Sequence, residues 1–161
     1  MIKAIICILF LTLQPISAMP AQQPTMRQWY AHVKVMASKY NLDPNLCAAL
    51  AAGDSGIGNQ EVRFCWVGYG KYHGPYNLHR CFLKKWDITD WRINTEVGIR
   101  RLAELMKSHN GNLHSALHHY NTDDKGRRYD RYIANIRRLQ KQYKKRGVFK
   151  EMRNYALEIL R

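Results

Sequence analysis

Apolar side chains recur every three or four residues along most of the chain, which is the spacing of amphipathic helices. The first such helix is predicted to begin at Thr25, because Gln28 follows three residues later as a capping-box partner. Asn41 is predicted to end it. The apolar stripe of this helix consists of Trp29, Val33, Met36 and Tyr40.

A cap and a proline mark the start of a second helix. Asp43 is a favourable N-cap residue, and Pro44 suits the first helical position, where an N–H is not needed. Gly53 is predicted to end this helix, whose apolar residues are Leu46, Cys47, Leu50 and Ala51. The same spacing predicts further helices over 95–108, over 113–120 with Asn112 as cap, over 129–143 and over 149–160.

The middle of the chain lacks this periodicity. Residues 56–74 combine five glycines with aromatic side chains, namely Phe64, Trp66, Tyr69 and Tyr72. That composition is typical of loops or short strands that line a binding surface, and a helical turn is expected over 78–86. Because no repeat and no sustained alternation interrupt the helices, the sequence predicts one mainly α domain of about six helices with a Gly/aromatic-rich segment.

The first 18 residues have the composition of a secretory signal peptide. Lys3 precedes an apolar run over 4–13, and Pro15, Ser17 and Ala18 supply a small-residue end. The run is too short to cross a hydrocarbon core of about 30 Å, and no later stretch is longer. We therefore expect Sec-type export with cleavage after Ala18, and a mature chain over 19–161 that is periplasmic or secreted. An uncleaved N-terminal anchor is the alternative.

The net charge points to a polyanionic partner. The chain has 26 Lys and Arg against 12 Asp and Glu, a charge of +14, and loss of residues 1–18 leaves +13. Export argues against a nucleic acid. Over 129–161 the basic residues indicate either a solvated helix face or retention at an anionic lipid or wall polymer. They include Arg137, Arg138, Lys141, Lys144, Lys145, Arg146 and Lys150.

Three cysteines remain after cleavage, and an exported protein can hold a disulfide. Cys65 and Cys81 flank one aromatic and glycine-rich segment, so we favour a disulfide between them. Closing that loop stabilises a protein by roughly 3 kcal/mol in the chain-entropy model. Cys47 is predicted to be a buried small apolar residue, and the odd number of cysteines leaves other pairings open.

Two ordered motifs resemble the lytic transglycosylases of the SLT type, within the lysozyme-like superfamily. The first is NLDPNLCAALAAGDSGIGN over 41–59, similar to the family helix that ends at a catalytic Glu-Ser and a glycine-rich turn. Between the two motifs, Gly74 and Leu78 match the central segment of the family, and the other residues of that segment do not match. The resemblance covers about 29–143. The residues of the second motif are Asn94, Gly98, Leu102, Leu105, Asn112, Ala116, Leu117, Tyr120 and Asn121.

The resemblance implies a lysozyme-like fold and a single catalytic carboxyl group, here Asp54 in place of the family Glu. In this family the acid, kept protonated by an apolar groove, donates a proton to the glycosidic oxygen. As a carboxylate it then removes the proton of the sugar's own C6 hydroxyl, so a 1,6-anhydro end forms without water. Asp is one methylene shorter than Glu, and a displacement of order 1 Å can cost about a hundredfold in rate.

Three interpretations of Asp54 are open. It is a working acid in a groove whose spacing suits the shorter Asp side chain, or it is an inactive site in a protein that only binds glycan strands. In the third interpretation it is a helix-end carboxylate with no role in catalysis. Glu61 is the alternative acid, unless it is a solvated loop carboxylate.

Further site residues come from the same resemblance. Ser55 is similar to the family Ser that steadies the acid or the substrate, and a simple turn residue is the alternative. Tyr120 and Asn121 resemble the family Tyr-Asn pair, with Tyr120 either beside the acid or in the core. The aromatic residues that face the sugar, unless they only pack, are Trp66, Tyr69 and Tyr72.

A metal site must also be considered, because His114 and His118 are four residues apart and lie on one face of a predicted helix. This spacing does not match a zinc signature, and neither does the set Cys65, His73, His79 and Cys81. No HExxH motif is present. We therefore expect no metal and no other cofactor.

The sequence thus predicts an exported, monomeric lytic transglycosylase that cleaves the MurNAc–GlcNAc bond of peptidoglycan. A catalytically inactive peptidoglycan-binding module of a secretion, conjugation or phage apparatus is the alternative. A secreted membrane-active protein is a third class, which accounts for the charge but not for the motif order.

Overall fold

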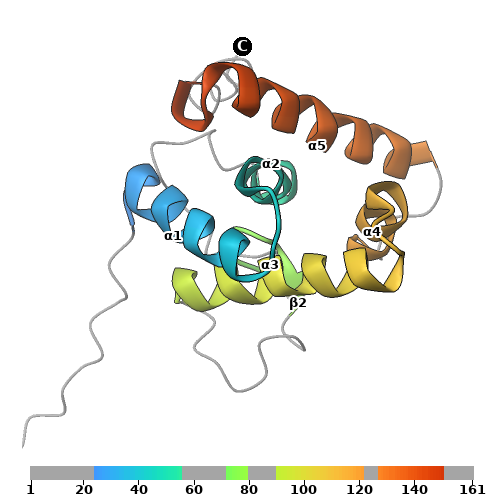
Figure 1. Ribbon diagram of the computed structural model, residues 1–161, viewed down its shortest axis with the longest axis horizontal. Coiled ribbons are helices and arrows are strands. Elements are labelled where there is room, and N and C mark those ends of the chain that lie inside the picture. The colour runs from blue at the N-terminus through green and yellow to red at the C-terminus, as the bar shows by residue number, and fades with distance from the viewer. Residues whose placement is uncertain (1–23, 56–71, 80–89, 122–126, 151–161) are drawn as a thin grey trace, which may run out of the picture.

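Five α-helices and one short β-hairpin make up the described part of this computed structural model, residues 24–55, 72–79, 90–121 and 127–150 (Figure 1). The mainly α prediction is confirmed, and the helices share one hydrophobic core. The elements are α1 (Met26–Lys39), α2 (Pro44–Ser55), β1 (Tyr72–His73), β2 (Leu78–His79), α3 (Trp91–Ser108), α4 (Leu113–Tyr120) and α5 (Arg127–Arg146).

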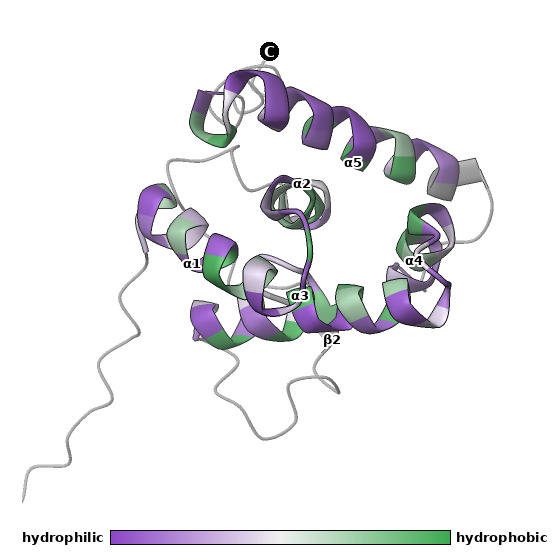
Figure 2. Cartoon of the chain, in the orientation of Figure 1, coloured by the Kyte–Doolittle hydropathy of each residue, from purple (hydrophilic) through white to green (hydrophobic). Residues whose placement is uncertain are grey.

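Helix α2 is the centre of the molecule. In Figure 1 it is seen end-on, with α5 above it, α1 and α3 below it and α4 beside it. Every residue over 46–52 is buried, and four of these seven are alanines, so neighbouring helices can approach closely. The surrounding helices turn their apolar sides toward α2 and their polar sides outward, as Figure 2 shows for α5.

Local capping signals place three of the helix starts as predicted. The Thr25 side chain accepts a hydrogen bond from the Gln28 backbone at 3.2 Å, and the Gln28 side chain accepts one from the Thr25 backbone at 2.8 Å. Asp43 accepts from the Asn45 backbone N–H at 2.9 Å and Asn112 from that of Ser115 at 3.1 Å. Each bond satisfies a helix N–H that has no partner within its own helix.

Other predicted boundaries were wrong. Helix α3 begins at Trp91, four residues earlier than expected, because Asp90 accepts a hydrogen bond from the Arg92 backbone at 2.8 Å and caps it. Gly53 does not end α2, which continues to Ser55. The residues over 78–79 form strand β2 instead of a helical turn. Residues 148–150 are helical, which agrees with the start of the last predicted helix, and the rest of that helix lies outside the described residues.

Glycine 53 serves close packing rather than termination. A Cβ atom there would lie 3.1 Å from Cγ1 of Ile136 on α5, tighter than an ordinary contact. The missing side chain therefore lets α5 pass close to the last turn of α2.

The hairpin is attached to α3 by a buried contact. Strands β1 and β2 pair antiparallel across a turn in which Gly74 has φ +73°, and a Cβ there would collide with the Asn94 side chain. Asn94 is fully buried, and its Oδ1 accepts a hydrogen bond from the Tyr76 backbone at 3.1 Å. At Gly98 an added Cβ would lie 2.4 Å from Cγ of Tyr76, so the Tyr76 ring fits on α3 only because residue 98 is glycine.

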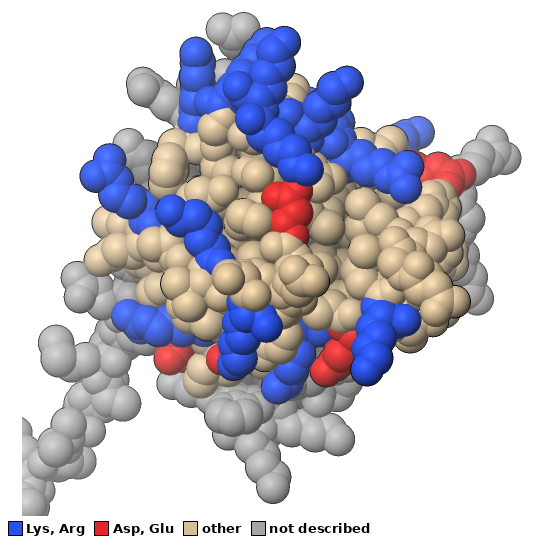
Figure 3. All heavy atoms as spheres, viewed as in Figure 1, with Lys and Arg blue, Asp and Glu red and all other residues tan. Residues whose placement is uncertain are grey.

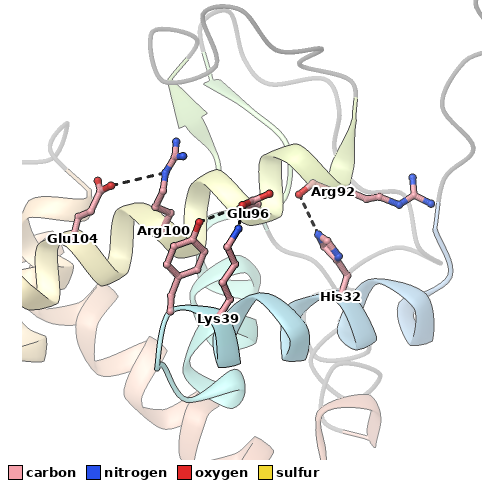
Figure 4. A network of polar contacts seen from close by, with 7 residues as sticks. His32, Lys39, Arg92, Glu96, Arg100 and Glu104 are labelled. Atoms are coloured by element: carbon pink, nitrogen blue, oxygen red, sulfur yellow. Dashed lines mark hydrogen bonds and ion pairs between the residues drawn. The ribbon is translucent and has the colours of Figure 1, made fainter.

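A polar network fastens α1 to α3 at the surface (Figure 4). Lys39 forms an ion pair with Glu96 at 2.6 Å, and the Tyr40 hydroxyl donates to the same carboxylate at 3.2 Å. His32 adds a ring-nitrogen contact of 3.3 Å to the Arg92 carbonyl. Because the Lys39–Glu96 pair is largely open to solvent, it contributes little to the free energy of unfolding. The network mainly sets the position of α1 relative to α3.

No helix within the described ranges is both long and apolar enough to cross a bilayer.

Candidate active site

Asp54 lies in the last turn of α2, held by a tyrosine from α5. The Tyr132 hydroxyl donates a hydrogen bond of 2.7 Å to Oδ1 of Asp54. The other carboxyl oxygen, Oδ2, is buried and has no hydrogen-bond partner among the residues that the structure describes. One oxygen of this carboxyl group is therefore fixed, and the other is left for a proton.

Burial controls the charge of Asp54. Loss of solvent around the carboxyl group raises its pKa from 3.8 to about 7, while the Tyr132 hydrogen bond and the positive charge of Arg101 lower the pKa less than burial raises it. Near neutral pH the group therefore exists in both protonation states. A carboxyl group in this condition can donate a proton and take one back.

Tyr120 lies on the α4 side of the same site. Its ring is buried, its hydroxyl has no hydrogen-bond partner in the described ranges, and burial together with the Asp54 charge raises its pKa well above the ordinary value of 10.0. Asn121 follows as the C-cap residue of α4, where its backbone N–H donates to the Leu117 carbonyl at 3.4 Å. The Tyr-Asn pair thus ends a helix next to the acid.

Arg101 connects α3 to this end of α4. Its guanidinium lies 5.2 Å from the centre of the Tyr120 ring and donates a 3.1 Å hydrogen bond to the Tyr120 carbonyl. The same cation lowers the pKa of Asp54. Arg101 therefore holds the last turn of α4 in place and favours the carboxylate form of Asp54.

Tyr76 supplies a third phenol from the hairpin. It is fully buried, and its hydroxyl donates to the Cys47 carbonyl of α2 at 3.1 Å. Burial raises its pKa well above 10.0, with smaller contributions from Cys47, Tyr120 and Asp54, in that order. Of these three tyrosines, Tyr132 contacts the carboxyl group directly, whereas Tyr120 and Tyr76 are influenced by its charge.

Comparison of the chain with models of protein families, with curated proteins and with solved structures finds no match. The motif order and the geometry around Asp54 are therefore the observations from which a function is inferred.

Two of the predicted site residues, Asp54 and Tyr120, come together, with Asn121 directly after Tyr120. Ser55 is the last residue of α2 and Tyr72 lies in β1, but the side chains of both lie outside the described part. Also outside it are the predicted signal peptide over 1–18 and Glu61, Cys65, Trp66, Tyr69 and Cys81.

Three neighbours of the acid were missed. Tyr132 lies in the helix predicted over 129–143 from its apolar spacing alone, and Tyr76 lies between Gly74 and Leu78 of the central segment. Arg101 carried a readable signal, because it lies three residues after Gly98 and four before Leu105, on the inward side of α3. A cation on an otherwise apolar face indicates a buried or catalytic partner.

The prediction that Cys47 is buried is confirmed: its side chain is fully buried and carries a free thiol. Histidines of α4 were considered above as metal ligands, and one histidine of that helix contacts the histidine that caps the end of α3. Nε2 of His109 lies 2.8 Å from Nδ1 of His119 across the α3–α4 junction. Within the described residues, no group of three or more His, Cys, Asp or Glu side chains is arranged to hold a metal ion.

Proposed function

We propose that this protein is a lytic transglycosylase that cleaves the MurNAc–GlcNAc bond of peptidoglycan, with Asp54 as its only acid and base. The observation that carries the proposal is the Asp54 carboxyl group, which has one oxygen held, one oxygen unpartnered among the described residues, and a pKa of about 7. The order of the two sequence motifs supplies the substrate class.

In the proposed reaction, protonated Asp54 gives its proton to the glycosidic oxygen as the bond to that oxygen breaks. The resulting carboxylate then removes the proton of the C6 hydroxyl, whose oxygen closes the 1,6-anhydro ring. One carboxyl group serves both steps, so no second carboxylate is needed, in contrast to most glycosidases. A pKa near 7 suits both steps because the group must be protonated first and charged afterwards.

The neighbours of Asp54 have separate roles in this proposal. Tyr132 binds Oδ1, which leaves Oδ2 to carry the proton. Arg101 stabilises the carboxylate formed halfway through the reaction. Tyr120 has a buried hydroxyl with no partner in the described part of the chain, and we assign it a hydrogen bond to the substrate.

Digestion of purified sacculi, with mass analysis of the released muropeptides, tests the proposal. The parent protein is expected to release 1,6-anhydro products, and Asp54→Asn is expected to release none because the amide cannot donate and recover a proton. Asp130→Asn is the matched control, since it removes an exposed carboxylate from the first turn of α5. It is expected to retain full activity.

Two other outcomes of the digestion would indicate a different function. Ordinary reducing ends in the products indicate hydrolysis by water, hence a lysozyme-type mechanism. Binding to sacculi without any release supports the alternative, an inactive peptidoglycan-binding module. The variant Asp54→Glu measures the fit of the acid: a gain in activity indicates the family geometry, and a loss indicates a site built around Asp.

A further inference from the structure

Helix α5 presents many cations to solvent. Its sequence holds nine Lys and Arg residues and a single acid, Asp130. The apolar side, which includes Ile133, Ile136, Leu139 and Tyr143, is buried against the core. Figure 3 shows Lys and Arg gathered along α5 at the top of the molecule. Lys144 is also exposed but forms an ion pair with Asp43 at 2.8 Å. We call the other exposed cations the α5 basic face: Arg131, Arg137, Arg138, Lys141, Lys145 and Arg146.

An exposed aromatic ring lies at the C-terminal end of this face. After Gly147, Val148 turns into the core while Phe149 remains 46% exposed. The Phe149 ring meets Tyr30 of α1 edge-on, with ring centres 5.6 Å apart. Lys34 lies 5.6 Å from the Tyr30 ring, and Lys150 is exposed beside Phe149. The exposed Phe149 ring thus packs on Tyr30, whose ring has a cation beside it, and is followed in sequence by another exposed cation.

We propose that the α5 basic face, with Phe149, docks on the surface of an anionic lipid bilayer. A 20-residue helix is about 30 Å long, so its exposed cations are spread along a broad, elongated side that suits a flat, negatively charged surface. Phe149 favours a bilayer over a hydrated anionic polymer, because an aromatic side chain gains by entering the headgroup region. The protein stays folded while it docks, since the apolar side of α5 remains in the core.

The docking surface is separate from the Asp54 site. Tyr132, which holds Asp54, faces α2, whereas the cations of the α5 basic face, including the adjacent Arg131, are exposed on the other side of the helix. Docking therefore brings the protein to a membrane without covering Asp54. The proposal does not depend on the activity of Asp54.

Cosedimentation of the protein with phosphatidylcholine vesicles, with and without anionic phosphatidylglycerol, tests the docking. Binding is expected only to the anionic vesicles and is expected to weaken as salt rises. Arg137→Gln with Lys141→Gln is expected to weaken binding about 25-fold, because each basic residue near an anionic membrane contributes roughly a factor of five. Phe149→Ala is expected to weaken binding further when added to that pair.

The matched control removes two charges elsewhere. Arg92→Gln with Lys107→Gln lowers the net charge equally, but on exposed positions of α3, and is expected to leave binding within about twofold because surface charges act over about 8 Å at physiological salt. Asp54→Asn is expected to bind vesicles like the parent. Equal loss in both double variants, equal binding to neutral vesicles, or binding to polyphosphate or nucleic acid but not to vesicles would each overturn the proposal.

Discussion

At the scale of single residues, the protein keeps a carboxyl group where its charged form is costly. Asp54 has a pKa of about 7 in the folded protein against an ordinary 3.8, so the folded state binds more protons than the unfolded state between these pH values. The contribution of Asp54 to the free energy of unfolding therefore falls as pH rises from about 4 to about 7. The full loss is about 4 kcal/mol above that range.

We predict that Asp54→Asn stabilises the protein against urea, most strongly above pH 7 and least near pH 4. The amide carries no charge to desolvate, and its oxygen can still accept the Tyr132 hydrogen bond. Urea unfolding of the parent and the variant across this pH range measures the difference. A difference that stays constant with pH would contradict the assigned burial of the carboxylate.

Tyr132→Phe is predicted to raise the pKa of Asp54 above its value in the parent. The phenol donates to Oδ1 and so favours the charged form of Asp54, which lowers its pKa. Without the phenol, the rise in pKa caused by burial is offset less. Carbon NMR titration of the carboxyl group checks the shift, and the pH profile of sacculus digestion should move upward with it. Tyr40→Phe is the control, because Tyr40 donates to Glu96 on the surface instead. An unchanged Asp54 titration in Tyr132→Phe would show that the hydrogen bond has no influence.

At the scale of elements, the hairpin and α3 fit together through Gly98. Replacing Gly98 with Ala would put Cβ within 2.4 Å of the Tyr76 ring, whose hydroxyl also binds the Cys47 carbonyl of α2. We predict that Gly98→Ala destabilises the protein by about 1–3 kcal/mol despite the better helix propensity of Ala. Denaturant unfolding measures this, with Lys107→Ala as an exposed control on the same helix. A stabilised Gly98→Ala variant would mean that the hairpin does not pack there.

Local contacts could be predicted from the sequence, whereas contacts between distant residues could not. Caps are local, so Thr25, Asp43 and Asn112 could be recognised from residues two or three positions away. The role of Gly53 depends on Ile136, and the Tyr132–Asp54 bond joins residues 78 positions apart. Such contacts leave no periodic signal. Motif order singled out Asp54 and Tyr120 as candidates, whereas the contacts of Tyr132, Arg101 and Tyr76 are visible only in the tertiary structure.

At the scale of the whole molecule, Cys47 reports on the integrity of the core. Its thiol is fully buried in the central helix, and burial raises its pKa to about 12. We predict that an alkylating reagent labels Cys47 only as fast as the molecule opens globally, and that denaturant speeds labelling in parallel with unfolding. Peptide mass analysis identifies the labelled residue. Fast labelling in native buffer would show local opening around α2.

The export signal, the disulfide between Cys65 and Cys81, and the monomeric state remain predictions at this scale. Digestion of the wall and docking on lipid are compatible in one protein, because Asp54 and the α5 basic face lie on different sides of α5. A protein docked in this way would meet the glycan strands nearest the bilayer.

The enclosure of α2 by α5 also sets when the chain can finish folding. The helix that carries Asp54 is covered by a segment that begins more than seventy residues later, so every part of the chain up to about residue 146 must be present before the alanine-rich centre is shielded from water. Truncation before α5 would therefore leave an apolar helix exposed and yield an aggregating fragment, not a smaller folded protein.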